Sequence, residues 1–320
     1  IDKQVIRLQY REKNGLKLSA LSLGTVQLGM SYGIANQHGK PEEEESFSII
    51  TEALRGGVCS FDTAHAYGDS ERLLGRYFST VQEKPFIVTK MSLPISPSTG
   101  SEQVARLMIQ KVEASLKDLQ LPKIPMMMLH NSDVLSFHSA VIASTFRQLK
   151  NEGLVERVGV SLGANVYEQQ EANVWKYVED DIYEAVQVPV NIFDHRLLCS
   201  GALRRMQDAG KVVFARSVFL QGLLFLEPEQ VPNQLAIVRE PLRKLHLLSK
   251  DEGLSLAQMA ISFVRDLEEV DSLVIGAETA QQVRQHLQWL KGPALPDNVR
   301  TKLKTITMDL PESILDPAKW

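Results

Sequence analysis

The sequence has little cysteine, no cluster of basic residues and no long apolar run, and each absence excludes a class of protein. Its 320 residues include two cysteines, Cys59 and Cys199, without metal-ligand spacing. We therefore expect reduced thiols, no metal site and a cytoplasmic protein. A net charge of −4 without a Lys/Arg block argues against nucleic-acid binding. No stretch approaches the ~20 apolar residues of a membrane span, and we find no signal-peptide core.

The chain also lacks a linker rich in glycine, proline or serine. Hydrophobic residues make up 44% of it and charged residues 23%, which is typical of a globular protein with a large core. We therefore predict one domain over residues 1–320, with a monomer as the default.

Eight short apolar runs alternate with eight longer segments of helical periodicity. The predicted strands are Ala20–Leu23, Cys59–Phe61, Phe86–Thr89, Ile124–Leu129, Val155–Val160, Ala185–Pro189, Val212–Ala215 and Leu273–Ile275. The predicted helices are Glu42–Arg55, Ser70–Phe78, Glu102–Leu119, Ser139–Glu152, Tyr167–Tyr177, Ala202–Ala209, Leu256–Arg265 and Ala280–Leu290. This alternation predicts an α/β fold, a (β/α)8 TIM barrel. A doubly wound open sheet is the alternative, and the absence of a GxGxxG motif after the first strand disfavours it.

Segments outside the repeat indicate additional elements. Strand-like runs at Val5–Tyr10 and Leu16–Ser19 flank Asn14-Gly15, a pair that suits a tight hairpin turn. Pro41 followed by Glu42–Glu45 predicts a helix start, where the helix dipole favours negative charges, rather than a cation site. We expect Pro228–Pro241 to be a loop leading into an extra helix at Leu242–Ser249. Residues 291–320 form a tail.

The stretch FDTAHAYGDSE at 61–71 carries the first candidate catalytic residues. Asp62 follows an apolar run and Tyr67 lies in the turn beyond it, while Lys90 and His130 end the next two runs. In a (β/α)8 barrel, functional groups collect at these carboxyl ends of strands. Asp62 would keep Lys90 charged, and that charge would make Tyr67 a better general acid. His130 would donate a hydrogen bond to a substrate oxygen. Each residue alone could be structural, but together they predict a catalytic site.

The remaining strand ends carry Gly24, Ser161, Gln187 with Asn191, Ser217 and Gly276.

These motifs, taken together, resemble the aldo-keto reductases over nearly the whole chain. The resemblance rests on GTVQLG at 24–29, FDTAHAYG at 61–68, VTK at 88–90, LHN ending at Asn131, GVS at 159–161, QVPVN at 187–191, RSVFLQGLL at 216–224 and IGAETAQQV at 275–283. It implies NAD(P)(H)-dependent reduction of an aldehyde or ketone, or the reverse oxidation, on a barrel whose floor is closed by an N-terminal β-hairpin.

The resemblance also implies residue roles. Tyr67 matches the general acid, Asp62 and Lys90 the pair that tunes it, and His130 the residue that orients the carbonyl. Tyr32, with Tyr67 and His130, is expected to contact substrate. The implied dinucleotide-binding residues are Gly24, Thr25, Asp62, Ser161, Gln187, Arg216, Ser217, Val218, Leu220, Gln221, Gly222, Ile275, Gly276, Ala277, Glu278, Gln282 and His286.

Several positions depart from the family pattern. Arg216 replaces an aromatic ring that stacks on the nicotinamide in many members, and Leu162 replaces an asparagine. Members that use NADPH usually surround its 2′-phosphate with Lys or Arg, whereas this chain has Glu278 in that loop. A carboxylate there would repel a phosphate and could accept hydrogen bonds from a ribose diol. We therefore place NAD(H) slightly ahead of NADP(H); the alternative is that Glu278 faces solvent and Arg284 supplies the positive charge.

Two other functions remain open. A Schiff-base aldolase or isomerase would use Lys90 as its nucleophile, and a non-catalytic subunit would only sense the dinucleotide. The sequence does not select a substrate among small aldehydes, aldoses and sugar derivatives. Candidates for the pocket wall are Tyr32, His38, Phe193, His195, Phe219 and Trp320.

Overall fold

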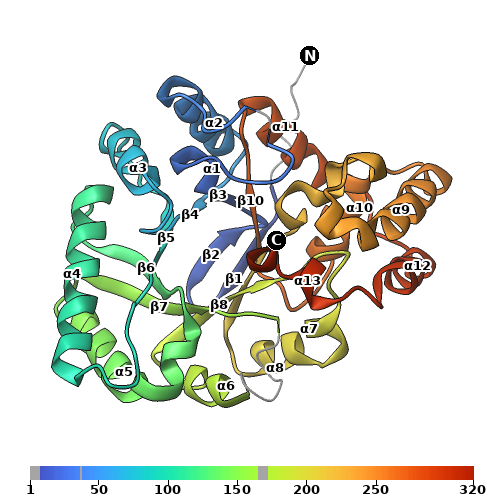
Figure 1. The fold of residues 1–320 in the computed structure, drawn as a ribbon. Coiled ribbons are helices and arrows are strands. Elements are labelled where there is room, and N and C mark those ends of the chain that lie inside the picture. Colours follow the sequence, from blue (N-terminus) through green and yellow to red (C-terminus); the bar gives the residue numbers. More distant parts are fainter. Residues whose placement is uncertain (1–7, 37, 165–171) are drawn as a thin grey trace.

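The chain forms a closed barrel of eight parallel strands in the computed structural model, which describes residues 8–36, 38–164 and 172–320 (Figure 1). The strands are β3 (Leu21–Gly24), β4 (Ser60–Asp62), β5 (Phe86–Met91), β6 (Ile124–Leu129), β7 (Val155–Ser161), β8 (Tyr183–Pro189), β9 (Val212–Arg216) and β10 (Ser272–Gly276). Strands that are consecutive in sequence pair with one another, and β10 pairs with β3 to close the barrel. The predicted (β/α)8 fold is confirmed, and the open-sheet alternative is wrong.

Eight helices follow the eight strands and surround the barrel. They are α2 (Glu43–Arg55), α3 (Ser70–Ser79), α4 (Ser101–Leu119), α5 (Leu135–Asn151), α6 (Ala172–Val178), α8 (Ala202–Asp208), α10 (Leu256–Arg265) and α11 (Ala280–Trp289). Helix α4 buries one apolar stripe, with Val104, Met108 and Val112 at four-residue spacing, whereas α10 is buried on all sides from Leu256 to Val264. The first turn of α2 contains Glu43, Glu44 and Glu45, which agrees with the predicted helix start.

Several predicted boundaries require correction. Helix α5 begins at Leu135 rather than Ser139, because a helical turn joins it across the non-helical residue His138. Most predicted strands end one or two residues too early, because several strands continue past the apolar run to a glycine or a polar residue, such as Gly24, Asp62 and Ser161. The predicted helix at 167–177 is described only from Ala172 onwards. The expected loop before Pro241 contains 3-10 turns at Pro228–Gln230 and Asn233–Val238, and α9 (Arg239–Glu252) extends the predicted extra helix in both directions.

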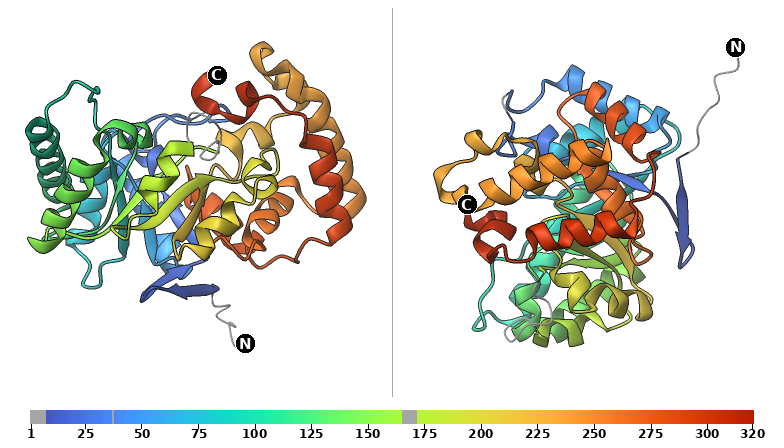
Figure 2. Two further views of the ribbon diagram at one scale, coloured as in Figure 1. Left: turned by 90° about the horizontal axis from the view of Figure 1, so that it is seen from below. Right: turned by 90° about the vertical axis from the view of Figure 1, so that its right-hand side faces the viewer.

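The tail is more structured than expected. It contains α12 (Asp297–Thr307), α13 (Glu312–Leu315) and a 3-10 turn at Pro317–Lys319. Short helices α1 (Val26–Gly29) and α7 (Arg196–Cys199), with 3-10 turns at Ser132–Val134 and Leu220–Phe225, lie in the loops that follow β3, β8, β6 and β9. Figure 2 shows the C-terminal residues at the end of the barrel opposite the N-terminal hairpin.

The N-terminal hairpin consists of β1 (Tyr10–Lys13) and β2 (Leu16–Ser19), which are antiparallel. Asn14 (φ 53°) and Gly15 (φ 70°) form the tight turn, as predicted. The first strand was predicted at Val5–Tyr10, but it begins at Tyr10: the turn sets Lys13 opposite Leu16, so Tyr10 pairs with Ser19, the last residue of β2. Residues 5–7 of that prediction lie outside the described residues.

The hairpin closes the floor of the barrel by filling its lower lumen. Leu16 and Leu18 are 7% and 1% exposed and pack against inward-facing side chains of the parallel strands. The cluster contains Leu16, Leu18, Val88, Met126, Met128, Ala185, Val212 and Phe214. Because side chains alternate along a strand, the residue two positions further on faces the upper lumen. The strands thereby direct Lys90, His130, Gln187 and Arg216 towards the opposite end of the barrel.

None of the helices within the described ranges is long and apolar enough to cross a membrane.

Candidate active site

A buried ion pair lies at the carboxyl ends of β4 and β5. Lys90 Nζ donates hydrogen bonds to Asp62 Oδ1 (2.6 Å) and to the carbonyl oxygen of Thr63 (2.9 Å). The second carboxylate oxygen of Asp62 accepts a hydrogen bond of 2.6 Å from Gln187 Nε2 on β8. Asp62, Lys90 and Gln187 are each no more than 3% exposed. Their buried polar groups therefore satisfy one another across the barrel.

Lys90 is held in its charged form. Burial by itself lowers the pKa of this ammonium, but attraction to Asp62 and Tyr67 outweighs burial, and the pKa lies above its usual value. The Lys90 ammonium lies 5.1 Å from the centre of the Tyr67 ring. A lysine that stays protonated is a fixed positive charge and a poor nucleophile.

Tyr67 and His130 face each other above this pair. Their rings meet edge to face with centroids 5.9 Å apart, and both residues are half-buried. Tyr67 is placed by the tight turn before α3, in which Gly68 has a φ of 54°. A Cβ at Gly68 would lie 2.4 Å from the carbonyl oxygen of Gly29, so only glycine fits there.

His130 is neutral at pH 7. Burial first, then the charges of Lys90 and Arg216, lower the pKa of His130 to about 4. Its Nδ1 is buried and has no hydrogen-bond partner among the described residues. An unpaired lone pair costs less than an unpaired buried N–H, so we infer that the proton resides on Nε2. His130 can therefore donate a hydrogen bond to a group near Tyr67.

The loop after β9 has an unusual backbone. Ser217, Leu220, Gln221 and Gly222 all have positive φ values between 46° and 91°. Non-glycine residues rarely adopt this conformation, and they cluster in sites where a ligand approaches the backbone. The carbonyl oxygen of Gln221 accepts a hydrogen bond of 3.0 Å from the amide of Ile34, which ties this loop to the loop after β3.

One cavity of about 1360 Å³ runs from Tyr67 and His130, past this loop, to α11. Of the expected dinucleotide-binding residues, the following line it: Gly24, Thr25, Asp62, Ser161, Gln187, Arg216, Ser217, Val218, Gln221, Gly222, Ile275, Gly276, Glu278, Gln282 and His286. Leu220 and Ala277 do not line it. They are at most 1% exposed because their side chains pack into the core.

Arg216 lies in this cavity, close to the catalytic candidates. Its guanidinium donates to the carbonyl oxygen of Leu162 (3.3 Å) and to Ser217 Oγ (3.2 Å), and no ion pair to it is found in the described parts of the chain. Tyr32 is nearby: burial first, then Tyr67, raise the pKa of its hydroxyl, while Arg216 and Gln221 act in the opposite direction. The polar group of Tyr32 thus borders the same space as Tyr67.

The far end of the cavity is bordered by Glu278, Gln282, Gln285, His286 and Trp289. Burial raises the pKa of the Glu278 carboxyl, and a hydrogen bond from Gln282 partly opposes this effect. Phe219, His286 and Trp289 pack together there, with ring centroids 5.6 to 6.2 Å apart. These rings and amides give this end of the cavity a mixed polar and aromatic wall.

Arg284 does not border this pocket. Its Nη1 pairs with Glu52 Oε2 on α2 at 3.0 Å. The alternative in which Arg284 supplies a positive charge to the site therefore has no support in this geometry.

Only two of the six pocket-wall candidates, Tyr32 and Phe219, line the cavity. Phe193 and His195 are buried beneath it, because the C-terminal segment folds over them. His195 Nε2 lies 3.0 Å from both the carbonyl oxygen of Ile192 and Thr307 Oγ1, which is a structural arrangement. The indole of Trp320 donates to the carbonyl oxygen of Ile314, and the exposed His38 is also outside the lining.

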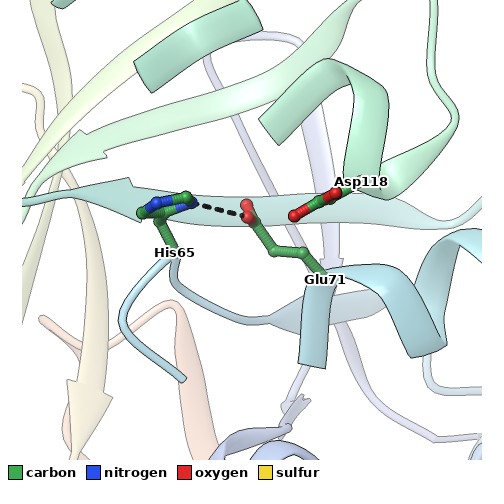
Figure 3. Close-up of side chains that lie close together, drawn as sticks. All are labelled: His65, Glu71 and Asp118. Carbon is green, nitrogen blue, oxygen red and sulfur yellow. Dashed lines mark hydrogen bonds and ion pairs between the residues drawn. The ribbon is translucent and has the colours of Figure 1, made fainter. Parts of the chain in front are cut away.

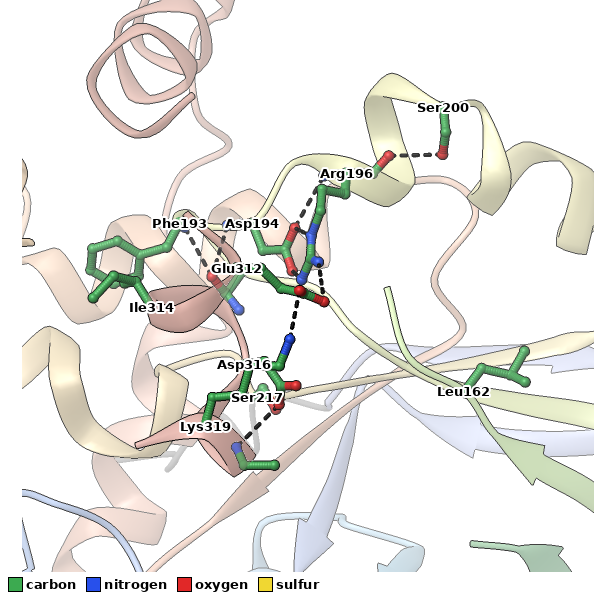
Figure 4. A network of polar contacts seen from close by, with 12 residues as sticks. Leu162, Phe193, Asp194, Arg196, Ser200, Ser217, Glu312, Ile314, Asp316 and Lys319 are labelled. Atoms are coloured by element: carbon green, nitrogen blue, oxygen red, sulfur yellow. Dashed lines mark hydrogen bonds and ion pairs between the residues drawn. The ribbon is translucent and has the colours of Figure 1, made fainter. Parts of the chain in front are cut away.

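The C-terminal segment nevertheless contributes to the wall through Asp316, Pro317 and Ala318. Glu312 tethers this segment, since its carboxylate contacts Arg196 Nη1 (3.8 Å) and Lys319 Nζ (2.6 Å), as Figure 4 shows. Trp320, the wall candidate from this segment, does not line the cavity, whereas the neighbouring residues 316–318 do. Other lining residues that sequence reasoning missed, such as Ser132, Asp133 and His246, lie on loops and on α9 and carry no motif.

A second polar cluster lies behind the Tyr67 turn. Ligand-type atoms of His65, Glu71 and Asp118 lie within 4.8 Å of one another, with Glu71 in the middle (Figure 3). Glu71 is 3% exposed and accepts hydrogen bonds from Thr89 Oγ1 (2.6 Å) and His65 Nδ1 (3.4 Å). These contacts link the turn that carries Tyr67 to the strand that carries Lys90.

Comparison with known proteins agrees with this fold. Residues 20–307 match the Aldo/keto reductase family, so the chain belongs to that family of oxidoreductases. It is 27% identical over 320 residues to L-glyceraldehyde 3-phosphate reductase of Escherichia coli O157:H7, covering 89% of this chain and 88% of the relative. It is 25% identical to L-galactose dehydrogenase of Arabidopsis thaliana, covering 98% and 96%. An aldo-keto reductase from Bacillus halodurans shares the fold, with a TM-score of 0.74, 20% identity and coverage of 94% and 96%.

Proposed function

We propose that this enzyme transfers a hydride between a nicotinamide dinucleotide and a carbonyl or alcohol substrate, with Tyr67 as general acid and base. The observation that carries the proposal is the buried Asp62–Lys90 pair directly beneath Tyr67 and His130 at one end of a long cavity. A tyrosine next to a permanent positive charge is a better proton donor than a free phenol.

The residues present fit a bound dinucleotide. The cavity of about 1360 Å³ exceeds the ~300–1,000 Å³ of ordinary ligand pockets, which leaves room for a substrate beside the cofactor. Gln27 Oε1 borders it and is a buried acceptor without a partner among the described residues. Ser161 and Gln187 would hold the carboxamide, and the loop from Ser217 to Gly222 would hold the pyrophosphate.

Each catalytic side chain has a separate task. The bound nicotinamide would supply or accept the hydride at the substrate carbon. Lys90 keeps its charge because Asp62 and Gln187 fix the ion pair. Tyr67 donates its hydroxyl proton to the substrate oxygen, and His130 Nε2–H donates a hydrogen bond to the same atom. The two donors stabilise negative charge that develops on that oxygen.

We further propose that NAD(H) is slightly preferred over NADP(H) and that the substrate is a sugar-type carbonyl compound. Glu278 borders the cavity and no Lys or Arg does so at that end, within the described residues. Near the reaction centre, the polar groups of Tyr32, Ser132 and Asp133 suit a hydroxylated substrate. Two relatives are named for sugar-type compounds, which supports the same substrate class.

The test is activity on a panel of aldehydes, aldoses and sugar derivatives, measured in parallel with NADH and NADPH. We expect reduction of at least one hydroxylated aldehyde and turnover with NADH at least equal to that with NADPH. Dinucleotide binding without turnover on the whole panel would contradict the proposal. Borohydride trapping of a substrate on Lys90 would instead support a Schiff-base enzyme, which the protonated state of Lys90 disfavours.

A further inference from the structure

Helices α2 and α11 pack side by side next to the far end of the cavity, and their N-termini are adjacent. Three contacts follow the α2–α11 interface in register: Glu45 with Ala280, Glu52 with Arg284, and the close approach of Gly56 to Leu287. Residue numbers increase together along both helices, so α2 and α11 run parallel. Figure 1 shows α2 and α11 side by side, and both N-termini lie at the carboxyl end of the barrel.

A helix N-terminus ordinarily attracts phosphate, because its first amides are free and the helix dipole is positive there. At α11, side chains of the protein accept from the first and third amides of the helix, and from the amide of Glu278 just before it. The amide of Ala280 donates to Glu45 Oε1 (2.9 Å), that of Gln282 to Thr279 Oγ1 (3.2 Å), and that of Glu278 to Gln282 Oε1 (2.7 Å). The group bonded to the first amide is a carboxylate from a different helix.

We propose that Glu45, on α2, acts together with Glu278 to select NAD(H) against NADP(H). This inference rests on the proposed function, which brings the adenosine ribose to the N-terminus of α11. A 2′-phosphate there would meet Glu278 on the cavity wall and the negative charge of Glu45 at the amide that it would otherwise bind. The cation of α11, Arg284, is held by Glu52 and does not border the cavity. A ribose diol carries no charge, so neither carboxylate repels it.

The discriminating experiment compares Glu45→Gln with Glu44→Gln. Glutamine at position 45 keeps an acceptor for the Ala280 amide and removes only the charge. Glu44 lies on the same turn but is exposed and outside the α11 contact, so its variant is the matched control. Dissociation constants for NADH and NADPH would be measured by fluorescence titration at one fixed pH and ionic strength.

We expect Glu45→Gln to bind NADPH about three- to tenfold more tightly than the wild type, with NADH binding unchanged within about twofold. The Glu44→Gln control should leave both constants unchanged. The pair 5′-AMP and adenosine 2′,5′-bisphosphate, used as probes of the adenosine end alone, should show the same ratio. An unchanged NADPH-to-NADH ratio in Glu45→Gln would overturn the role of Glu45.

A second measurement needs no variant and covers the case in which Glu45→Gln does not fold. Salt screens repulsion between the carboxylates and a phosphate, so NADPH affinity relative to NADH should rise with ionic strength in the wild type. A relative loss of NADPH affinity would indicate a cationic phosphate site and overturn the inference. Failure of the wild type to bind either dinucleotide would overturn the proposed function itself, which is a distinct result.

Discussion

The lower and upper halves of the barrel lumen are built by the same strands, yet their chemistry differs. The lower layer is apolar and contains Val88, Ala185 and Phe214 with the hairpin leucines. Two residues further along the same strands are Lys90, Gln187 and Arg216, which face the cavity end. Side chains two residues apart on a strand point to the same face of the sheet, so both layers face the barrel lumen. The comparison shows that two residues along a strand separate side chains that pack in the apolar core of the barrel from polar side chains of the candidate site.

If the lower layer serves stability, removing the hairpin should have the largest effect. Deleting residues 1–19 removes Leu16 and Leu18 from the lumen and exposes the apolar side chains beneath them. We expect the free energy of unfolding to fall by about 3–6 kcal/mol, from about 1.5–3 kcal/mol for each buried leucine. Urea denaturation followed by tryptophan fluorescence measures this. A truncated protein as stable as the full chain would show that the hairpin is not a plug.

If the upper layer serves catalysis, removing its proton donor should lower turnover strongly without unfolding the protein. Tyr67→Phe should lower turnover by about 100-fold or more, equivalent to about 2.7 kcal/mol of barrier, with dinucleotide binding and melting temperature nearly unchanged. The matched control is Tyr77→Phe on α3, whose hydroxyl contacts Thr51 outside the cavity. Wild-type turnover in Tyr67→Phe would contradict the assignment of the general acid.

A substitution in the cavity wall near α11, outside the barrel lumen, should change only the preference between NADPH and NADH. Glu278→Arg replaces a carboxylate by a cation, and we expect the NADPH-to-NADH affinity ratio to rise about tenfold or more, equivalent to about 1.4 kcal/mol. Turnover at saturating cofactor should change little, because the catalytic side chains lie at the other end of the cavity. If wild-type NADPH binding were a hundredfold tighter than NADH binding, Glu278 could not face the ribose.

A substitution on the protein surface should have the smallest effect on stability and activity. Glu43 pairs with Arg76 on the surface, and both side chains are close to half exposed. Glu43→Gln should therefore change stability by only about 0.3–1 kcal/mol, through the exposed ion pair and the dipole of α2. Activity should not change. A large loss of turnover would show that the acidic run belongs to a site and is more than a helix start.

The sequence by itself determined the barrel, because that fold depends on local periodicity. Eight apolar runs between amphipathic segments have few ways to bury their faces, and the Asn14-Gly15 turn specifies its hairpin through φ values alone. The four catalytic candidates could also be proposed from the sequence, since Asp62, Lys90 and His130 follow apolar runs and Tyr67 lies in the turn after the first of these. Their hydrogen bonds could be identified only in the tertiary structure, because partners such as Gln187 and Asp62 lie 125 residues apart in the sequence.

Only the tertiary structure decided which loop residues border the cavity. Phe193 and His195 were plausible wall residues, but the C-terminal segment covers them and places Asp316–Ala318 at the wall instead. Glu45 lies in an acidic run that predicts only a helix start, and its contact with Ala280 spans 235 residues. Such contacts depend on how helices pack side by side, which is set by long-range complementarity of side chains. Local periodicity carries no information about that packing.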